Sequence, residues 1–185
     1  MVLLKSTDSE FFKSLAPFKL LSVNNDVISS DELISENGLV VLFTCNHCPY
    51  AIALWNRVIS DYNKIQKLGF NLVAINPNIN PDYPADSFDE MKKLSFNKKL
   101  PFNYLVDETQ AVAKQYDAQC TPDIFVINKD HKLLYRGAYD DNWKDEQNIK
   151  QHYLINALNF YNSNSIKSEF KTQPSMGCSI KWVNV

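Results

Sequence analysis

Two cysteines separated by two residues carry the clearest chemical signal in this chain. Cys45 and Cys48 lie in the run CNHCPY, which occupies residues 45–50. The residues before it, 38–44, are largely apolar on both faces, which is typical of a fully buried strand. After it, apolar residues recur every three or four positions between residues 52 and 68, and this spacing predicts a helix. The dithiol is therefore predicted to lie where a buried strand turns into a helix.

Such a position favours a thiolate, the form of cysteine that attacks disulfides. The backbone N–H groups at a helix N-terminus are unpaired, and the positive end of the helix dipole stabilises an anion there. A protonated His47 between the cysteines would add positive charge beside the Cys45 sulfur. Together these effects would lower the pKa of Cys45 from about 8.5 to a value between roughly 3.5 and 7.5. We predict that Cys45 is the nucleophile, that His47 assists it, and that Cys48, the less exposed thiol, resolves the mixed disulfide.

Two other interpretations of this motif are a zinc half-site and a chance spacing. Structural zinc usually takes a second close pair of ligands, whereas the remaining cysteines, Cys120 and Cys178, are isolated in the sequence. We therefore favour redox chemistry and expect neither a metal nor a cofactor. A metal-binding or carrier protein that uses the pair together with Cys120 or His47 stays open as a third class of function.

Length and composition limit the other possibilities. The chain has 185 residues, enough for a single domain with a substantial core, and a formal net charge of −2. This charge gives no electrostatic reason to expect nucleic acid or an anionic membrane as a partner. The apolar runs are too short to span a membrane. The first residues lack the pattern of a signal peptide, so we expect a cytoplasmic protein, in which a Cys-x-x-Cys motif is more often catalytic than structural.

Strands and helices are predicted to alternate along the rest of the chain. Strands are expected over residues 16–20, 70–76, 102–106, 124–127 and 132–137, and helices over 30–33, from 88, after Asp107 and over 149–161. A capping-box pattern at residues 7–10 indicates the start of a further short helix. This alternation predicts an α/β sheet with helices on both faces. We divide the single domain, 1–185, into an N-terminal extension (1–37), a core (38–161) and a C-terminal tail (162–185).

The arrangement resembles the thioredoxin fold, with a dithiol at a strand-to-helix turn, a Thr-Pro before a later strand, and a closing hairpin and helix. Residues 78–106 look like the insertion found in peroxiredoxins and in TlpA/ResA-type thiol-disulfide oxidoreductases. More narrowly, four segments are similar to the peroxiredoxin-like family related to alkyl hydroperoxide reductase and thiol-specific antioxidant (AhpC/TSA) that carries Cys-x-x-Cys: 43–50, 120–123, 135–141 and 174–182. The resemblance covers nearly the whole chain and implies a thioredoxin-like α/β fold, a central mixed sheet flanked by helices.

The resemblance also implies roles for the residues around Pro122. Pro122 would be in the cis form and would face the dithiol, and the Thr121 backbone would bind an extended substrate chain. Cys120 would then lie near the dithiol, either as a third redox thiol or as a small buried apolar residue. In the tail, Cys178 either reaches Cys120 or the dithiol as an extra resolving partner, or is merely packed.

The chain departs from two patterns of the proteins that it resembles. Peroxiredoxins bind peroxide with a Pro-x-x-x-Thr-x-x-Cys pattern, whereas here Thr44 directly precedes Cys45 and the proline is missing. Thioredoxins carry an acidic residue in the strand before the first cysteine, and Leu39 takes that position here. The base that deprotonates Cys48 is therefore open, with His47 or a water molecule as candidates.

We predict a thiol-disulfide oxidoreductase in which Cys45 and Cys48 cycle through a disulfide. The alternative is a thiol peroxidase or antioxidant protein that reduces peroxides through Cys45. The expected substrates are a protein or small-molecule disulfide, or a peroxide, and the expected reductant is a thioredoxin or glutathione system. We expect a monomer or weak homodimer, with no nucleic acid and no membrane as partner.

Overall fold

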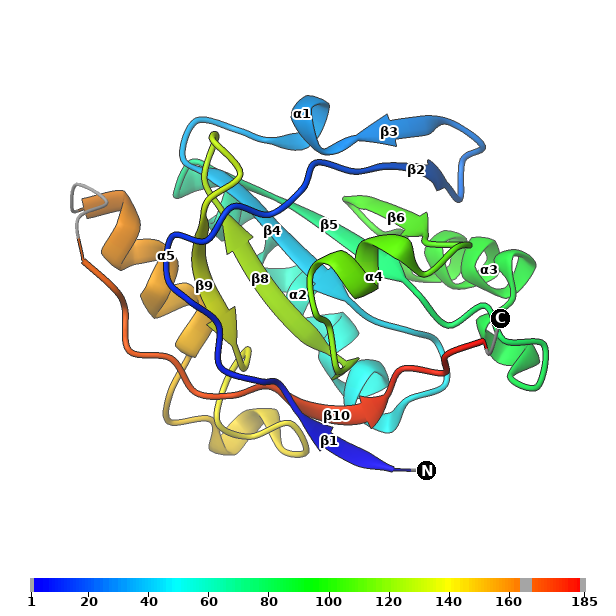
Figure 1. The fold of residues 1–185 in the computed structure, drawn as a ribbon. Coiled ribbons are helices and arrows are strands. Elements are labelled where there is room, and N and C mark those ends of the chain that lie inside the picture. Colours follow the sequence, from blue (N-terminus) through cyan, green and yellow to red (C-terminus); the bar gives the residue numbers. More distant parts are fainter. Residues whose placement is uncertain (1, 164–167, 184–185) are drawn as a thin grey trace.

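The computed structural model describes residues 2–163 and 168–183 (Figure 1). Of the predicted tail, residues 164–167 and 184–185 lie outside the described part. The strands are β1 (Leu3–Lys5), β2 (Lys19–Ser22), β3 (Val27–Ser29), β4 (Gly38–Phe43), β5 (Phe70–Asn76), β6 (Asn103–Val106), β7 (Cys120–Thr121), β8 (Asp123–Ile127), β9 (Leu133–Gly137) and β10 (Met176–Ser179). The α-helices are α1 (Ser30–Leu33), α2 (Pro49–Lys67), α3 (Phe88–Lys98), α4 (Ala111–Gln115) and α5 (Tyr153–Ser163), and two short 3-10 helices are η1 (Pro84–Asp86) and η2 (Glu146–Asn148).

A seven-stranded sheet forms the centre of the molecule, in the order β3-β2-β6-β5-β4-β8-β9. β4 runs parallel to β5 and antiparallel to β8, and β5 runs parallel to β6. The predicted central mixed sheet flanked by helices is confirmed. All six residues of β4 are buried, because the strand has a neighbour on each side and helices over both faces, and this explains its continuous apolar sequence.

Alternate residues of β4 point into two hydrophobic cores on opposite faces of the sheet. Val40 and Leu42 belong to the core that α2, α3 and α5 cover. Leu39 and Val41 belong to the opposite core, which α1 and α4 close. In Figure 1, α2 and α5 lie behind the sheet and α4 lies in front of it. The sheet therefore fixes the end of β4, and with it the starting point of the segment 44–48.

The helix boundaries follow local signals in the sequence. Pro49 occupies the first turn of α2, where its missing N–H has no partner to lose. Ser87 caps α3 by accepting a hydrogen bond from the Glu90 N–H at 3.4 Å. The last helix differs from the prediction, because it begins at Tyr153 rather than at residue 149. Within the described residues, no helix has the length and apolar character needed to cross a membrane.

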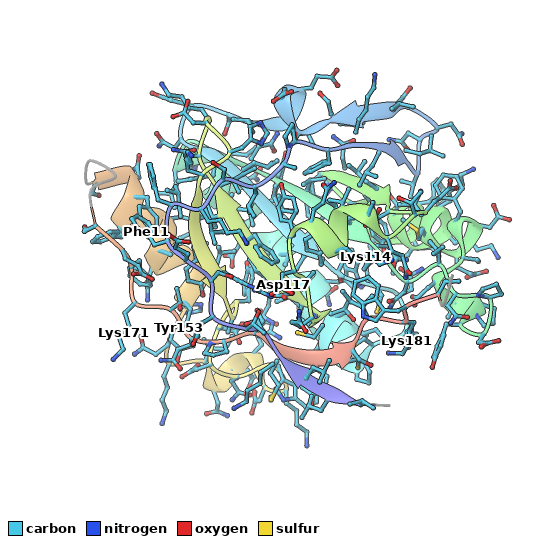
Figure 2. All side chains as sticks on the ribbon, in the orientation of Figure 1. Phe11, Lys114, Asp117, Tyr153, Lys171 and Lys181 are labelled. Atoms are coloured by element: carbon cyan, nitrogen blue, oxygen red, sulfur yellow. The ribbon has the colours of Figure 1, made fainter. Side chains whose placement is uncertain are left out.

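The capping-box pattern near the N-terminus does not start a helix. The Thr7 and Ser9 hydroxyls instead accept hydrogen bonds from the Arg136 guanidinium, at 2.8 and 2.9 Å. This long-range contact replaces the local caps that the pattern suggested. The following segment packs on α5, where the Phe11 ring lies 6.4 Å from that of Tyr161 (Figure 2).

The tail contains a strand that the sequence analysis did not predict. β10 pairs antiparallel with β1 on one side and with β7 on the other, which gives a separate three-stranded sheet. β10 also contacts α2, the helix that follows the dithiol. Figure 1 shows β1 and β10 side by side along one end of the central sheet. The two ends of the chain thus meet at the predicted site.

Candidate active site

The segment from Cys45 to Cys48 joins β4 to α2, as the sequence predicted. β4 ends at Phe43, and the Thr44 N–H still donates to the Ile75 carbonyl of β5 at 2.9 Å, which fixes where the loop begins. Cys48 is the N-cap residue of α2, whereas Cys45 lies outside the helix. Both cysteines are buried, with an exposed fraction of 0% for each.

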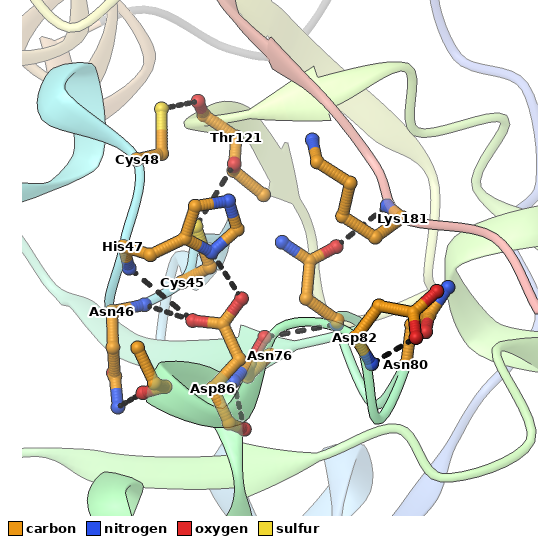
Figure 3. Close-up of polar contacts among 12 residues, drawn as sticks. Cys45, Asn46, His47, Cys48, Asn76, Asn80, Asp82, Asp86, Thr121 and Lys181 are labelled. Atoms are coloured by element: carbon orange, nitrogen blue, oxygen red, sulfur yellow. Dashed lines mark hydrogen bonds and ion pairs between the residues drawn. The ribbon is translucent and has the colours of Figure 1, made fainter. Parts of the chain in front are cut away.

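Both sulfur atoms converge on Thr121 (Figure 3). The Cys45 sulfur lies 3.2 Å from the Thr121 hydroxyl oxygen, and the Cys48 thiol donates to the Thr121 carbonyl oxygen at 3.0 Å. The two thiols also interact with each other, and this interaction shifts the pKa of both. The peptide bond between Thr121 and Pro122 is cis. The residue before Pro122 therefore touches both thiols of the pair.

The groups around Cys48 lower its pKa, although the hydrogen bond that its thiol donates to the Thr121 carbonyl oxygen favours the protonated form. The pKa of Cys48 is lowered to about 5, first by the hydrogen bond from the Cys45 thiol and then by the Cys178 thiol and the N–H groups of Ala51 and Cys178, against the opposing effect of burial. Ala51 lies in the first turn of α2, so part of this stabilisation comes from the free N–H groups of the helix N-terminus.

The prediction placed the acidic thiol at Cys45, whereas the surroundings in this structure lower the pKa of Cys48. The pKa of Cys45 is raised by burial, by its interaction with Cys48 and by the negative charge of Asp86, which together outweigh the hydrogen bond to Thr121. The largest cause at Cys48 is its interaction with Cys45, and the Ala51 N–H of α2 contributes less. The expected difference in exposure between the two cysteines is absent.

Asp86 organises the loop between the two cysteines. Its buried carboxylate accepts the Asn46 N–H at 2.7 Å and the His47 N–H at 3.2 Å, and its second oxygen lies 2.5 Å from the His47 ring Nδ1 (Figure 3). His47 was predicted to place a positive charge beside Cys45; its ring has a ligand atom within 4.8 Å of the Cys45 sulfur and is also bound by the buried acid. Sequence reasoning missed Asp86, because it lies 39 residues from His47 and no local pattern marks it.

Cys45, His47 and Asp86 also form the one group of possible metal ligands found in the described part of the chain, with ligand atoms within 4.8 Å of one another. Two ligand atoms on one tetrahedral zinc ion, each at roughly 2.0–2.2 Å from it, lie more than about 3 Å apart. The His47 and Asp86 atoms are 2.5 Å apart and hydrogen-bonded. In this arrangement the pair fits a hydrogen bond rather than a shared ion.

Of the two isolated cysteines, Cys178 is the one that joins the dithiol. It packs with Cys45 and Cys48 in one buried cluster, which does not contain Cys120. Cys120 is buried as well, but its thiol donates to the Pro122 carbonyl oxygen at 3.4 Å. None of the four cysteines is part of a disulfide in this structure.

The resemblance implied that the backbone edge at Thr121 is open to a substrate. In this structure the edge is not open. β10 already pairs with it, so that Cys178 lies opposite Thr121 and Ser179 lies opposite Cys120. The tail therefore occupies the position that an extended substrate chain was expected to take. A substrate chain can bind this edge only after β10 has moved.

A cavity of about 290 Å³ lies beside Pro122. Tyr50 and Trp143 form part of its wall, with their ring centroids 4.1 Å apart, and Met176 of β10 lines it as well. The cysteine sulfurs do not line this cavity, although Tyr50 closely follows Cys48 in the chain. The cavity thus adjoins the wall of the dithiol site without reaching the sulfurs.

A family model described as the AhpC/TSA family matches residues 13–136, which include the dithiol, Asp86 and Pro122. The chain belongs to the AhpC/TSA family. Membership supports a thiol-based oxidoreductase. The matched stretch ends before β10, so Cys178 lies on a segment that follows the matched residues. A search of the curated proteins finds no significant match.

Solved structures agree with this assignment. An uncharacterized conserved protein from Geobacillus kaustophilus is 36% identical, with a TM-score of 0.92 over 100% of this chain and 98% of that one. Peroxidoxin BcpB from Mycobacterium tuberculosis shares 16% identity, with a TM-score of 0.63 over 84% and 98%. The thioredoxin domain of a thiol-disulfide oxidoreductase from Bacteroides vulgatus shares 13%, with a TM-score of 0.56 over 70% and 89%. The last two likenesses show a common thioredoxin-like fold.

Proposed function

We propose that the protein is a thiol-disulfide oxidoreductase in which Cys45 and Cys48 alternate between a dithiol and a disulfide. The observation that carries this proposal is the convergence of both sulfurs on Thr121. Two thiols that contact one common residue need little movement to form a bond. The acidic pKa of Cys48 supplies a thiolate at neutral pH.

The charge distribution assigns the first attack to Cys48. Its thiolate attacks one sulfur of the substrate disulfide, a Cys48–substrate disulfide forms, and the other half of the substrate leaves as a thiolate. Cys45 transfers its proton to this leaving thiolate and then attacks the Cys48 sulfur. The Cys45–Cys48 disulfide forms, the second half of the substrate leaves as a thiol after protonation, and two electrons have passed from protein to substrate.

Asp86 serves this sequence by fixing the loop rather than by touching the substrate. It binds the N–H groups of Asn46 and His47 and so holds the loop between the cysteines in one conformation. Its negative charge adds to burial and to the interaction with Cys48 in raising the pKa of Cys45. The contribution from Cys48 ends when Cys48 enters a disulfide, so the two thiols do not carry charge at once.

Access to the sulfurs requires movement of the tail. Both sulfurs are fully buried, and the nearby cavity ends at Tyr50, Pro122 and Met176. A small disulfide such as glutathione disulfide needs a smaller opening than a folded protein, and glutathione or a thioredoxin would then reduce the Cys45–Cys48 disulfide. We propose these partners on the chemistry of the site alone.

Single-turnover reaction with glutathione disulfide tests the proposal. In the reduced protein we expect release of two glutathione molecules and a Cys45–Cys48 disulfide, found by peptide mapping after acid quenching and alkylation. The Cys45→Ser/Cys178→Ser variant should hold one glutathione on Cys48, and Cys48→Ser should take up none at pH 6. The Cys120→Ser variant serves as the control and should react like the natural sequence.

Two outcomes would overturn parts of this assignment. Glutathione on Cys45 in Cys48→Ser, with none on Cys48 in the other variant, would return the first attack to Cys45. Absence of any Cys45–Cys48 disulfide in the reacted protein would exclude the oxidoreductase cycle. Stopped-flow reaction with hydrogen peroxide tests the peroxidase alternative, which requires a rate above that of a free thiol.

A further inference from the structure

The tail presents Cys178 to the dithiol in a defined register. In the antiparallel pairing of β10 with β7, Cys178 lies directly opposite Thr121, and Ser179 lies opposite Cys120. Residues directly opposite each other in such a pair point to the same face, and their neighbours point to the other face. Because the Thr121 side chain contacts the Cys45 sulfur, Cys178 is on the dithiol face and Cys120 is not.

Gly177 allows the tail backbone to approach the peptide before Pro122. A Cβ atom at this position would lie 2.1 Å from the Thr121 carbonyl oxygen, so only glycine fits without displacement of the strand. Hydrogen bonds also hold the residues just before and just after β10. The Ser175 N–H donates to the Ser6 hydroxyl, and the Lys181 N–H donates to the Asn78 side chain, each at 2.8 Å.

We propose that Cys178 is a third redox-active residue, which exchanges with Cys48 from the edge position where a substrate chain would lie. This inference rests on the proposed oxidoreductase function. Three observations carry it: the shared buried cluster, the register opposite Thr121, and the close approach at Gly177. The tail is then an internal substrate that the chain itself supplies.

The exchange is balanced without an external oxidant. When Cys48 carries half of a substrate disulfide, the Cys178 thiolate attacks the Cys48 sulfur. The bond to the substrate breaks, the Cys48–Cys178 disulfide forms, and the leaving thiolate takes the proton that Cys178 lost. Starting instead from the Cys45–Cys48 disulfide, the same attack releases Cys45 as the thiol and moves no net electrons.

The pKa of Cys178 depends on whether Cys48 is reduced or part of a disulfide. In the reduced protein the pKa of Cys178 is raised by burial, by its hydrogen bond to Cys48 and by the charge of Cys48, while Lys181 opposes them. Once Cys48 is part of a disulfide, it has neither that charge nor a thiolate to bind. The two contributions from Cys48 then vanish, and Cys178 ionises more readily at the stage where its attack is needed.

A Cys45→Ser variant isolates this step, because Cys178 is then the remaining thiol of the cluster that can displace a substrate from Cys48. After reaction with glutathione disulfide, we expect Cys45→Ser to release the glutathione bound at Cys48 and to form a Cys48–Cys178 disulfide. Release should be at least about tenfold faster than in Cys45→Ser/Cys178→Ser, because the attacking thiol is held beside its target. Intact mass of quenched samples measures the release of glutathione, and peptide mapping identifies the Cys48–Cys178 disulfide.

The Cys45→Ser/Cys120→Ser variant is the matched control and should release glutathione as fast as Cys45→Ser. Persistent glutathione on Cys48 in Cys45→Ser, at the level of the double serine variant, would overturn the role of Cys178 and leave the oxidoreductase function intact. Failure of the double variant to take up glutathione at Cys48 would instead count against the proposed function. A circular dichroism spectrum like that of the natural sequence shows that each variant has folded.

Discussion

The Asp86 carboxylate lies 2.5 Å from the His47 ring and accepts the backbone N–H groups of Asn46 and of His47 itself. It also acts on the dithiol, because its negative charge contributes to the raised pKa of Cys45. Among the side chains, the sequence had assigned an effect on Cys45 to His47 alone. The structure adds an acid that binds the His47 ring and raises the pKa of Cys45.

Asp86→Asn is therefore expected to lower the pKa of Cys45. The amide oxygen can still accept the N–H groups of Asn46 and His47, but the charge that opposes the thiolate is lost. In a Cys48→Ser background, the pH at which iodoacetamide alkylates Cys45 at half its maximal rate should move downward. Asp82→Asn, an exposed acid of the same loop, is the control. An unchanged alkylation profile in Asp86→Asn would show that the charge of Asp86 does not reach the sulfur.

The strand and helix around the dithiol could be predicted from the sequence, because their signals are local. β4 is apolar throughout, since both its faces are buried, and the apolar stripe of α2 has helical spacing. Pro49 marks the start of that helix. The strand-to-helix turn, and hence the placement of Cys45 and Cys48, follows from these features alone.

The charge distribution and the tail could not be predicted, because they depend on contacts between distant residues. Asp86 meets His47 across 39 positions, and Lys181 meets Asn78 across 103. β10 has only four residues and no alternating apolar pattern, so nothing local indicates a strand. The exact start of α2, after Cys48, is likewise a boundary that sequence patterns locate only approximately.

The lowered pKa of Cys48 predicts an unusual pH dependence of alkylation. Above a pKa of about 5 the thiolate is fully formed, so the alkylation rate of Cys48 should be constant between pH 6 and 8 and should fall by half near pH 5. A free cysteine, with a pKa of about 8.5, would still be gaining reactivity over that range. Mass spectrometry of the Cys48 peptide measures the rate at each pH.

The same shift predicts a loss of stability in acid. A folded-state pKa below that of the unfolded thiol stabilises the reduced protein fully above about pH 8.5, and this contribution is lost as the pH falls through about 5. Cys45→Ser replaces the thiol that most lowers this pKa and should move both profiles to higher pH. A natural-sequence profile that follows free cysteine would contradict the assignment of the anion to Cys48.

Arg57 holds the loop that forms one wall of the cavity. Its guanidinium forms a buried ion pair with Asp140 and donates to the carbonyl oxygens of Asn142 and Trp143, at 3.1 and 2.9 Å. Arg57→Met leaves the Asp140 carboxylate buried without a cation beside it, so we expect a loss of about 3–5 kcal/mol in the free energy of unfolding.

Urea denaturation followed by circular dichroism measures this loss. The matched control is Lys64→Met, which removes an exposed cation from the same helix and should change the free energy of unfolding by less than about 1 kcal/mol. Equal effects of the two substitutions would mean that the Arg57 pair contributes no more than a surface charge. A lower alkylation rate at the dithiol is not expected from either change, since neither residue contacts a sulfur.

Gly177→Ala tests two effects of the tail on Cys48: how far it limits access to the sulfur, and how far it lowers the pKa of the thiol. The added Cβ would meet the Thr121 carbonyl at 2.1 Å, so β10 must move away from β7. Cys48 then becomes accessible, and its alkylation rate at pH 9, where the thiolate is fully formed in either protein, should rise. It also loses the hydrogen bonds from Cys178, so its pKa should increase and the half-maximal rate should move to higher pH. Ser179→Ala, which places no new atom against Thr121, should change neither quantity. A faster reaction at pH 9 without a shift in the half-point would mean that the tail covers the dithiol but does not tune it.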